Sequence, residues 1–107
     1  MANQPYQLRY SYDTDQFTGE LALQYPEGVI YPNHTQTAAL DLSLGPHREV
    51  GASAMIYIVA NGDAITVPSD WVLYGDSIST VSGDTNILVV TYMGADKIHY
   101  SNKVIPA

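Results

Sequence analysis

The sequence contains no cysteine and only four lysines and arginines among its 107 residues. The lack of cysteine excludes disulfides, a thiolate nucleophile and a thiolate zinc site. Eleven aspartates and glutamates leave a net charge of −7. This balance argues against nucleic acid as a partner, because each phosphate contact requires a cation, and it suits an anionic membrane surface no better.

Long apolar runs are also missing, since no stretch approaches the roughly 18 residues of a membrane span. The first five residues, Met1-Ala2-Asn3-Gln4-Pro5, lack the charged and apolar regions of a signal peptide. We therefore expect the protein to be made in the cytosol. With 46% hydrophobic residues, the chain is expected to fold as one domain around a single modest core.

The dominant feature that is present is the β-branched and aromatic run over residues 86–94. Ile87, Val89 and Met93 share one face of the predicted strand, and Leu88, Val90 and Tyr92 share the other. Leaving either face in water forfeits burial on the order of 1.5 to 3 kcal/mol per side chain. The pattern predicts a central strand with two covered faces, followed by a hairpin partner over residues 97–100.

Further apolar stretches precede this strand, over residues 40–44, 50–60, 64–67 and 71–74. Asn61-Gly62-Asp63 is typical of a type I′ hairpin turn that joins the second stretch to the third. No window of eleven or more residues combines the apolar periodicity of a helix with helix-capping residues. The sequence predicts an all-β fold, either an antiparallel β-sandwich or a small jelly roll, in which Trp71, Tyr57 and Tyr92 belong to the core.

Residues 1–36 differ from the remainder in being rich in tyrosine and proline. We interpret them as an N-terminal extended arm or a set of edge strands, and residues 37–107 as the β-sandwich core. Such an arm suits a contact with a neighbouring molecule, because tyrosine combines apolar area with a hydroxyl that needs a partner. The predicted contact residues are Tyr6, Arg9, Tyr10, Tyr12, Phe17, Tyr25 and Tyr31.

A catalytic alternative starts from Gly75-Asp76-Ser77, which resembles the nucleophile block of the GDSL (SGNH) esterases and lipases. With Asp96 and His99 it would form a nominal triad. The context argues against it, because that family places the block after a parallel strand of an α/β sheet, and its Gly and Asn oxyanion-hole blocks are missing here. Since Ser and Asp are ordinary turn residues, we expect no enzyme and no catalytic residue.

A metal site has equally little support. Asp13-Thr14-Asp15 begins like a calcium loop but lacks the later ligands of an EF-hand. Histidines 34, 47 and 99 lack ligand spacing. Turn aspartates at 63, 76, 84 and 96 could gather at one end of a sandwich and hold Ca²⁺. The preferred interpretation is that they are solvated turn residues, so we expect no metal and no cofactor.

Residues 51–101 resemble a pattern of small β-rich structural proteins of tailed bacteriophages, including head decoration proteins and the β-domains of fibres. The similarity lies in the strand and return over residues 55–68, the lone Trp71, and the run from Asn86 to Ser101 with its paired aromatics. It implies a virion structural protein, a capsid decoration (cement) protein. That protein would bind the major capsid protein on the head surface as a homotrimer and stabilise the mature shell.

Three other functions stay open. The same fold could serve a phage fibre, tail or neck component that binds a receptor or another virion protein. A carbohydrate-binding sandwich would stack Trp71 and exposed tyrosines on sugar rings. A hydrolase using Ser77 is the weakest alternative.

Overall fold

The computed structural model describes residues 11–12, 19–23 and 29–107 of the chain. These residues form strands, turns and loops, and no helix occurs among them. The all-β prediction is therefore confirmed for this part of the chain. No helix in the described residues has the length and apolarity that a membrane crossing requires.

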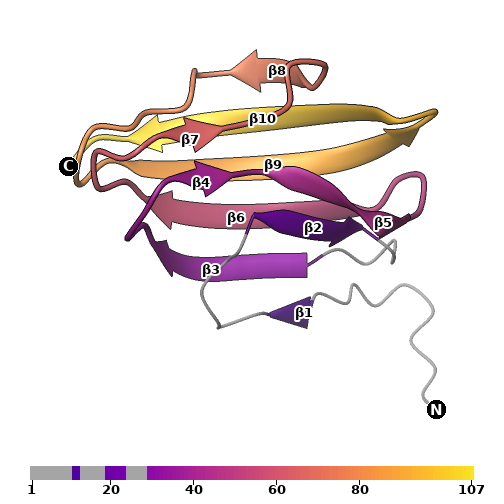
Figure 1. The fold of residues 1–107 in the computed structure, drawn as a ribbon, viewed down its shortest axis with the longest axis horizontal. Helices are drawn as coiled ribbons and strands as arrows, with labels where there is room; N and C mark the ends of the chain where they lie inside the picture. The colour runs from indigo at the N-terminus through magenta and orange to yellow at the C-terminus, as the bar shows by residue number, and fades with distance from the viewer. Residues whose placement is uncertain (1–10, 13–18, 24–28) are drawn as a thin grey trace, which may run out of the picture.

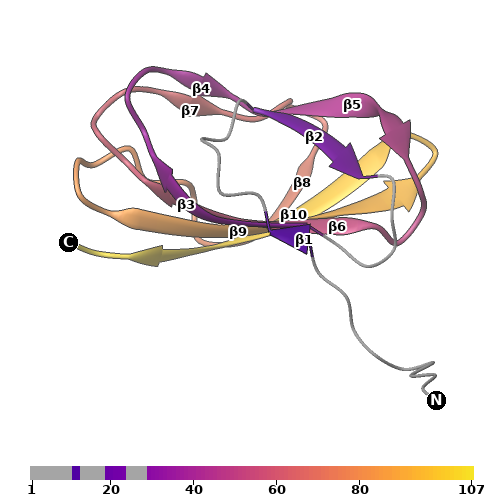
Figure 2. The ribbon, with the colours of Figure 1, turned by 90° about the horizontal axis from the view of Figure 1, so that it is seen from below.

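The described residues form ten strands (Figure 1), which lie in two layers (Figure 2). In chain order they are β1 (Ser11–Tyr12), β2 (Glu20–Leu23), β3 (Val29–Thr35), β4 (Leu40–Asp41), β5 (Ser43–Arg48), β6 (Ser53–Val59), β7 (Ile65–Thr66), β8 (Val72–Gly75), β9 (Thr85–Gly94) and β10 (Lys97–Ile105). Six of them form one sheet in the order β1-β3-β6-β9-β10-β8. The pairs β2-β5 and β4-β7 form two small ladders that lie on the same side of this sheet (Figure 2).

Strand β9 is central, as the sequence predicts, and pairs antiparallel with β6 and with β10. The β9–β10 hairpin is confirmed. It turns at Ala95 and Asp96, which both have positive φ, the conformation that a two-residue hairpin turn of this kind requires. Along β9, Asn86, Leu88 and Val90 are buried, and they alternate with half-buried residues on the other side.

The expectation of antiparallel pairing holds only for these two contacts. Among the described strands the pairs β1-β3, β3-β6, β8-β10, β2-β5 and β4-β7 are parallel. Parallel neighbours need a crossover connection. After β3 the chain leaves the large sheet, contributes β4 and β5 to the covering layer, and returns as β6 in the same direction. The covering ladders are thus the crossovers of the main sheet.

The hairpin predicted around Asn61-Gly62-Asp63 is wrong, although the turn exists. Gly62 has a φ of +100° and the Asp63 amide donates to Asn61 Oδ1 at 3.0 Å. The strand that follows, β7, pairs with β4 in the covering layer instead of returning along β6. Buried Gln36 stabilises this departure: its Nε2 donates to the Asp63 and Ala64 carbonyls, and its Oε1 accepts from the Asn61 amide.

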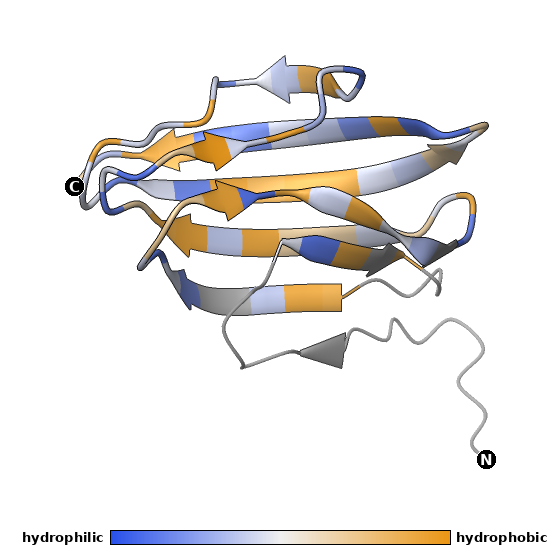
Figure 3. Ribbon diagram, in the orientation of Figure 1, coloured by the Kyte–Doolittle hydropathy of each residue, from blue (hydrophilic) through white to orange (hydrophobic). Residues whose placement is uncertain are grey.

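The core lies between the six-stranded sheet and the ladders, where Figure 3 shows apolar segments on both layers. Trp71 belongs to it, as predicted, and meets Tyr100 edge to face at 6.0 Å between ring centroids. Tyr92 is partly buried against the core. Tyr57 does not belong to it: the prediction is wrong, because its place in β6 puts it on the opposite side from buried Ile56 and Ile58. The buried apolar residues are Leu21, Leu23, Leu40, Leu42, Ala52, Ala54, Ile56, Ile58, Ala60, Ile65, Trp71, Leu88, Val90, Ile98 and Tyr100.

The described residues before position 37 supply strands to both layers. Leu21 and Leu23 of β2 are fully buried in the covering layer. Strand β3 lies beside β6, and β1 follows it at the edge of the sheet. The division of the chain into a segment 1–36 and a core 37–107 stays a prediction.

A small polar network crosses the core at one end of β9. Asn86 is fully buried; its Oδ1 accepts from the Ser79 amide at 2.8 Å and from Asn102 Nδ2 at 3.2 Å. Its Nδ2 donates to the Ser79 carbonyl at 2.8 Å. The Asn86 amide thus ties the loop before β9 to strands β9 and β10.

Replacing Asn86 with Leu is expected to destabilise the fold by about 2 to 3 kcal/mol, because the part-buried amide and carbonyl of Ser79 lose their partner and the Asn102 side-chain amide loses one of its two acceptors. Denaturant unfolding followed by circular dichroism measures the change. The matched control is Asn61→Ala, which removes one exposed hydrogen bond and should cost less than about 1 kcal/mol. Equal losses for the two variants would contradict the role given to the Asn86 network.

His34 gives the fold a pH dependence. It is buried opposite Ile58, and burial lowers its pKa from the ordinary value of 6.5. The folded chain therefore binds fewer protons at this site than the unfolded chain. The resulting stability is present above about pH 6.5 and is lost as the pH falls through the lowered pKa. Melting temperatures at pH 7.5 and pH 5 should differ more for the natural chain than for His34→Gln, and an equal pH response would exclude this contribution.

Candidate functional site: the open face of the main sheet

The side of the six-stranded sheet that faces away from the ladders is covered by no other described strand (Figure 2). We call it the open face. The strand registers place alternate residues of β3, β6, β9, β10 and β8 on it. They are Ile30, Thr35, Ser53, Met55, Tyr57, Val59, Val72, Tyr74, Thr85, Ile87, Val89, Thr91, His99, Ser101, Lys103 and Ile105.

The open face is apolar at its centre. Its middle row runs across the five strands as Ile30, Met55, Val89, Ser101 and Tyr74. Val89, on the central strand, stands at the midpoint of this row. Soluble monomers rarely expose contiguous apolar patches of more than a few hundred Å², and larger ones mark interaction sites.

Charge is nearly absent from the open face. Among the positions that the strand registers place there, Lys103 carries the single full charge and none is acidic. Asp76 stands at its border, where its carboxylate accepts from the Val104 amide at 3.0 Å. The acidic residues of the described strands and turns are therefore kept off one broad surface.

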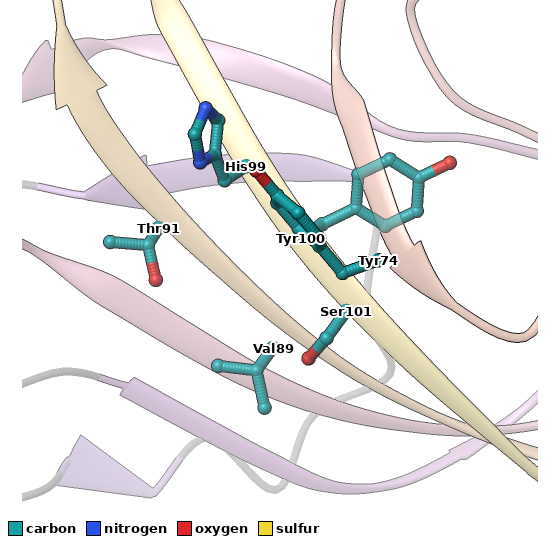
Figure 4. Close-up of a pocket in the computed structure, with 6 residues that line it drawn as sticks. All are labelled: Tyr74, Val89, Thr91, His99, Tyr100 and Ser101. Carbon is teal, nitrogen blue, oxygen red and sulfur yellow. The ribbon is translucent and has the colours of Figure 1, made fainter.

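A shallow depression of about 170 Å³ interrupts this surface over β8, β9 and β10 (Figure 4). Val89, Thr91 and Ser101 line it together with the rings of Tyr74 and His99 and part of Tyr100. The Tyr74 and His99 rings lie 5.4 Å apart, and 54% of Tyr74 is exposed. The depression thus combines an exposed aromatic ring with hydroxyl and imidazole groups.

The sequence predicts the open face only in part. It indicates two apolar faces on residues 87–93 and predicts that both are covered. The described residues cover the face of Leu88 and Val90 and leave that of Ile87 and Val89 uncovered. The signal for an interaction surface was therefore the second apolar face of the central strand.

The nominal triad is not assembled. Asp96 lies in the β9–β10 turn and forms an ion pair with Arg48 at 3.0 Å. Gly75 pairs with Asn102, three residues along β10 from His99, which is about 10 Å at the usual rise of a strand. Ser77 follows Gly75, and its carbonyl accepts from Asn102 Nδ2 at 3.4 Å. That the chain is no enzyme stays a prediction.

The Gly75-Asp76 pair has a structural task instead. Gly75 has a φ of +95°, and a Cβ there would stand 2.6 Å from the Asn102 carbonyl oxygen. Asp76 donates its amide to that same oxygen at 2.9 Å and accepts from the Val104 amide. The motif therefore fastens the end of β8 to β10.

The turn aspartates do not gather. Asp84 accepts from the Ser79 hydroxyl at 2.7 Å and from the Ala107 amide at 3.1 Å, whereas Asp96 pairs with Arg48 at the other end of β9. Among residues 11–12, 19–23 and 29–107, no group of three or more His, Cys, Asp or Glu side chains could hold a metal ion.

The predicted tyrosine contacts remain a prediction. Tyr6, Arg9, Tyr10, Phe17 and Tyr25 lie outside the described residues, and Tyr12 is described only as part of β1. Tyr31 is in β3, where it packs partly buried against the core.

Comparison with known proteins finds no family model that matches the chain, and no significantly similar curated protein or solved structure.

Gly75→Ala is expected to destabilise the fold by about 2 to 3 kcal/mol, since it adds a Cβ against a backbone oxygen at a positive φ. Denaturant unfolding measures this loss of stability.

Ser77→Ala should change stability by less than about 0.5 kcal/mol and leave any hydrolysis of a nitrophenyl ester unchanged. Denaturant unfolding and an ester assay measure the two effects. Hydrolysis that disappears with Ser77→Ala would restore the nucleophile hypothesis.

Proposed function

We propose that this chain is a virion structural protein, a capsid decoration protein that binds the head surface and stabilises the mature shell. The observation that carries the proposal is the open face, an apolar surface almost without charge on an otherwise acidic chain. Such a surface is typical of a component of a larger assembly. The resemblance of residues 51–101 to phage decoration proteins suggests that this assembly is a phage head.

The fold supports this role in a second way. The six-stranded sheet and the ladders face each other over one core, and we propose that they form a β-sandwich. A rigid sandwich presents the open face as a preformed surface, so little ordering is required when a partner binds. A protein that binds the mature shell and not its precursor shifts the equilibrium toward the mature state.

A fibre, tail or neck component is the second candidate, and the depression favours it. The exposed ring of Tyr74 and the hydroxyls of Thr91 and Ser101 are groups that stack on, and hydrogen-bond with, a sugar ring of a receptor. Trp71 cannot take part in such stacking, because it is buried against Tyr100.

Immunogold electron microscopy of particles from the source of this chain tests the proposal. Label distributed over the heads is expected, and heads stripped of the protein should break at a lower temperature than heads to which it has been added back. Label confined to tails or fibres would favour the second candidate. Absence of label from every particle would contradict both.

A further inference from the structure

We infer that two copies of this chain pack against each other through their open faces, sheet to sheet, about a two-fold axis near Val89. The inference deepens the proposed function by naming the partner that covers this surface, and it puts a pair of copies in place of the homotrimer that the resemblance of residues 51–101 implies. It leaves the remainder of each copy free to contact a shell.

The size of the open face fits this arrangement. Strands β3, β6, β9 and β10 have seven to ten residues, so they are about 23 to 33 Å long and, at a spacing of about 4.8 Å, about 19 Å wide together. The four-residue β8 adds on the order of 60 Å². Each copy would therefore contribute on the order of 500 to 700 Å² of sheet. Two such faces together, about 1,000 to 1,400 Å², reach the lower part of the range of about 1,200 to 2,000 Å² that specific protein interfaces bury.

The charge distribution favours a second copy as the occupant. A strongly acidic partner would find only Lys103 on the open face, and a basic partner would find no carboxylate there. A surface of matching chemistry has to be apolar and nearly neutral, and the open face of another copy is such a surface. Face-to-face packing also keeps the described acidic residues of both copies, such as Asp41, Asp84 and Asp96, away from the shared surface.

The shape of the open face is complementary to that of a second copy related by a two-fold rotation. An axis along β9 brings β6 of one copy over β10 of the other. Met55 shares the middle row with Ser101, so Met55 of each copy would lie over the depression beside Ser101 of its partner. Methionine suits this place, because its flexible side chain fills irregular gaps.

Sedimentation equilibrium of the full chain tests the pairing. Concentrations on the order of 10 to 100 μM suit it, because interfaces of this size can have dissociation constants in the micromolar range. The natural chain should have twice the 11.7 kDa mass of one copy. Val89→Glu and Val89→Lys should each be monomeric, because like charges meet at the axis. An equimolar mixture of the two should regain the mass of a pair, which a folding defect cannot explain.

Thr37→Glu and Thr37→Lys are the matched controls, since Thr37 is exposed in the loop between β3 and β4. They should pair as the natural chain does. Met55→Lys, at a second position of the open face, should also be monomeric. Circular dichroism spectra like that of the natural chain confirm that each variant is folded.

Several results would overturn the inference: a monomeric natural chain, a trimer, or a pair that survives both Val89 substitutions. If the natural chain is monomeric and deletion of residues 1–10 makes it pair, those residues occupy the open face instead of a second copy. Loss of head binding by Val89→Glu in a monomeric chain would assign the face to the shell, and the proposed function would stand. A natural chain that pairs but labels no particle would leave the inference standing and remove the proposed function.

Discussion

The antiparallel pairing of β9 with β6 and β10 is the constraint on which the remaining structure depends. Its register decides which side chains enter the core and which reach the open face, because neighbouring residues of a strand point to opposite sides. Leu88 and Val90 thereby join the core, while Ile87 and Val89 form the centre of the open face. A shift of one residue would exchange the two sets and place Asn86, with its hydrogen bonds, outside the core.

Both the core and the open face use aliphatic side chains, yet they differ in how polar groups accompany them. Inside, the side chains of Asn86 and Gln36 bind backbone groups of loops, so each loop has one position over the core. On the open face, hydroxyls and one lysine lie among the apolar residues. This mixture is tolerated by water and can also be buried by a partner, as expected of a surface that is exposed before assembly.

Much of the strand content could be predicted from the sequence, because period-two patterns and turn residues are local signals. The β9–β10 hairpin and the burial of Trp71 are confirmed on that basis. Strand partners were less predictable. Asn61-Gly62 does form a turn, but the direction of the chain beyond it is set by Gln36, which is distant in sequence. The sequence predicts that β9 has a second apolar side. That no described strand covers this side follows from the topology, which the sequence pattern does not reveal.

The parallel pairs also affect how fast the chain can fold. Val29 pairs with Ala54 and Val72 pairs with His99, so these contacts close only after long intervening segments have been ordered. The cost of closing such loops has to be met before the contacts stabilise anything, which slows folding. The β9–β10 hairpin needs only a two-residue turn and forms locally. Because β9 and β10 follow the other four strands of the sheet in the chain, the sheet cannot be completed during synthesis until both have left the ribosome.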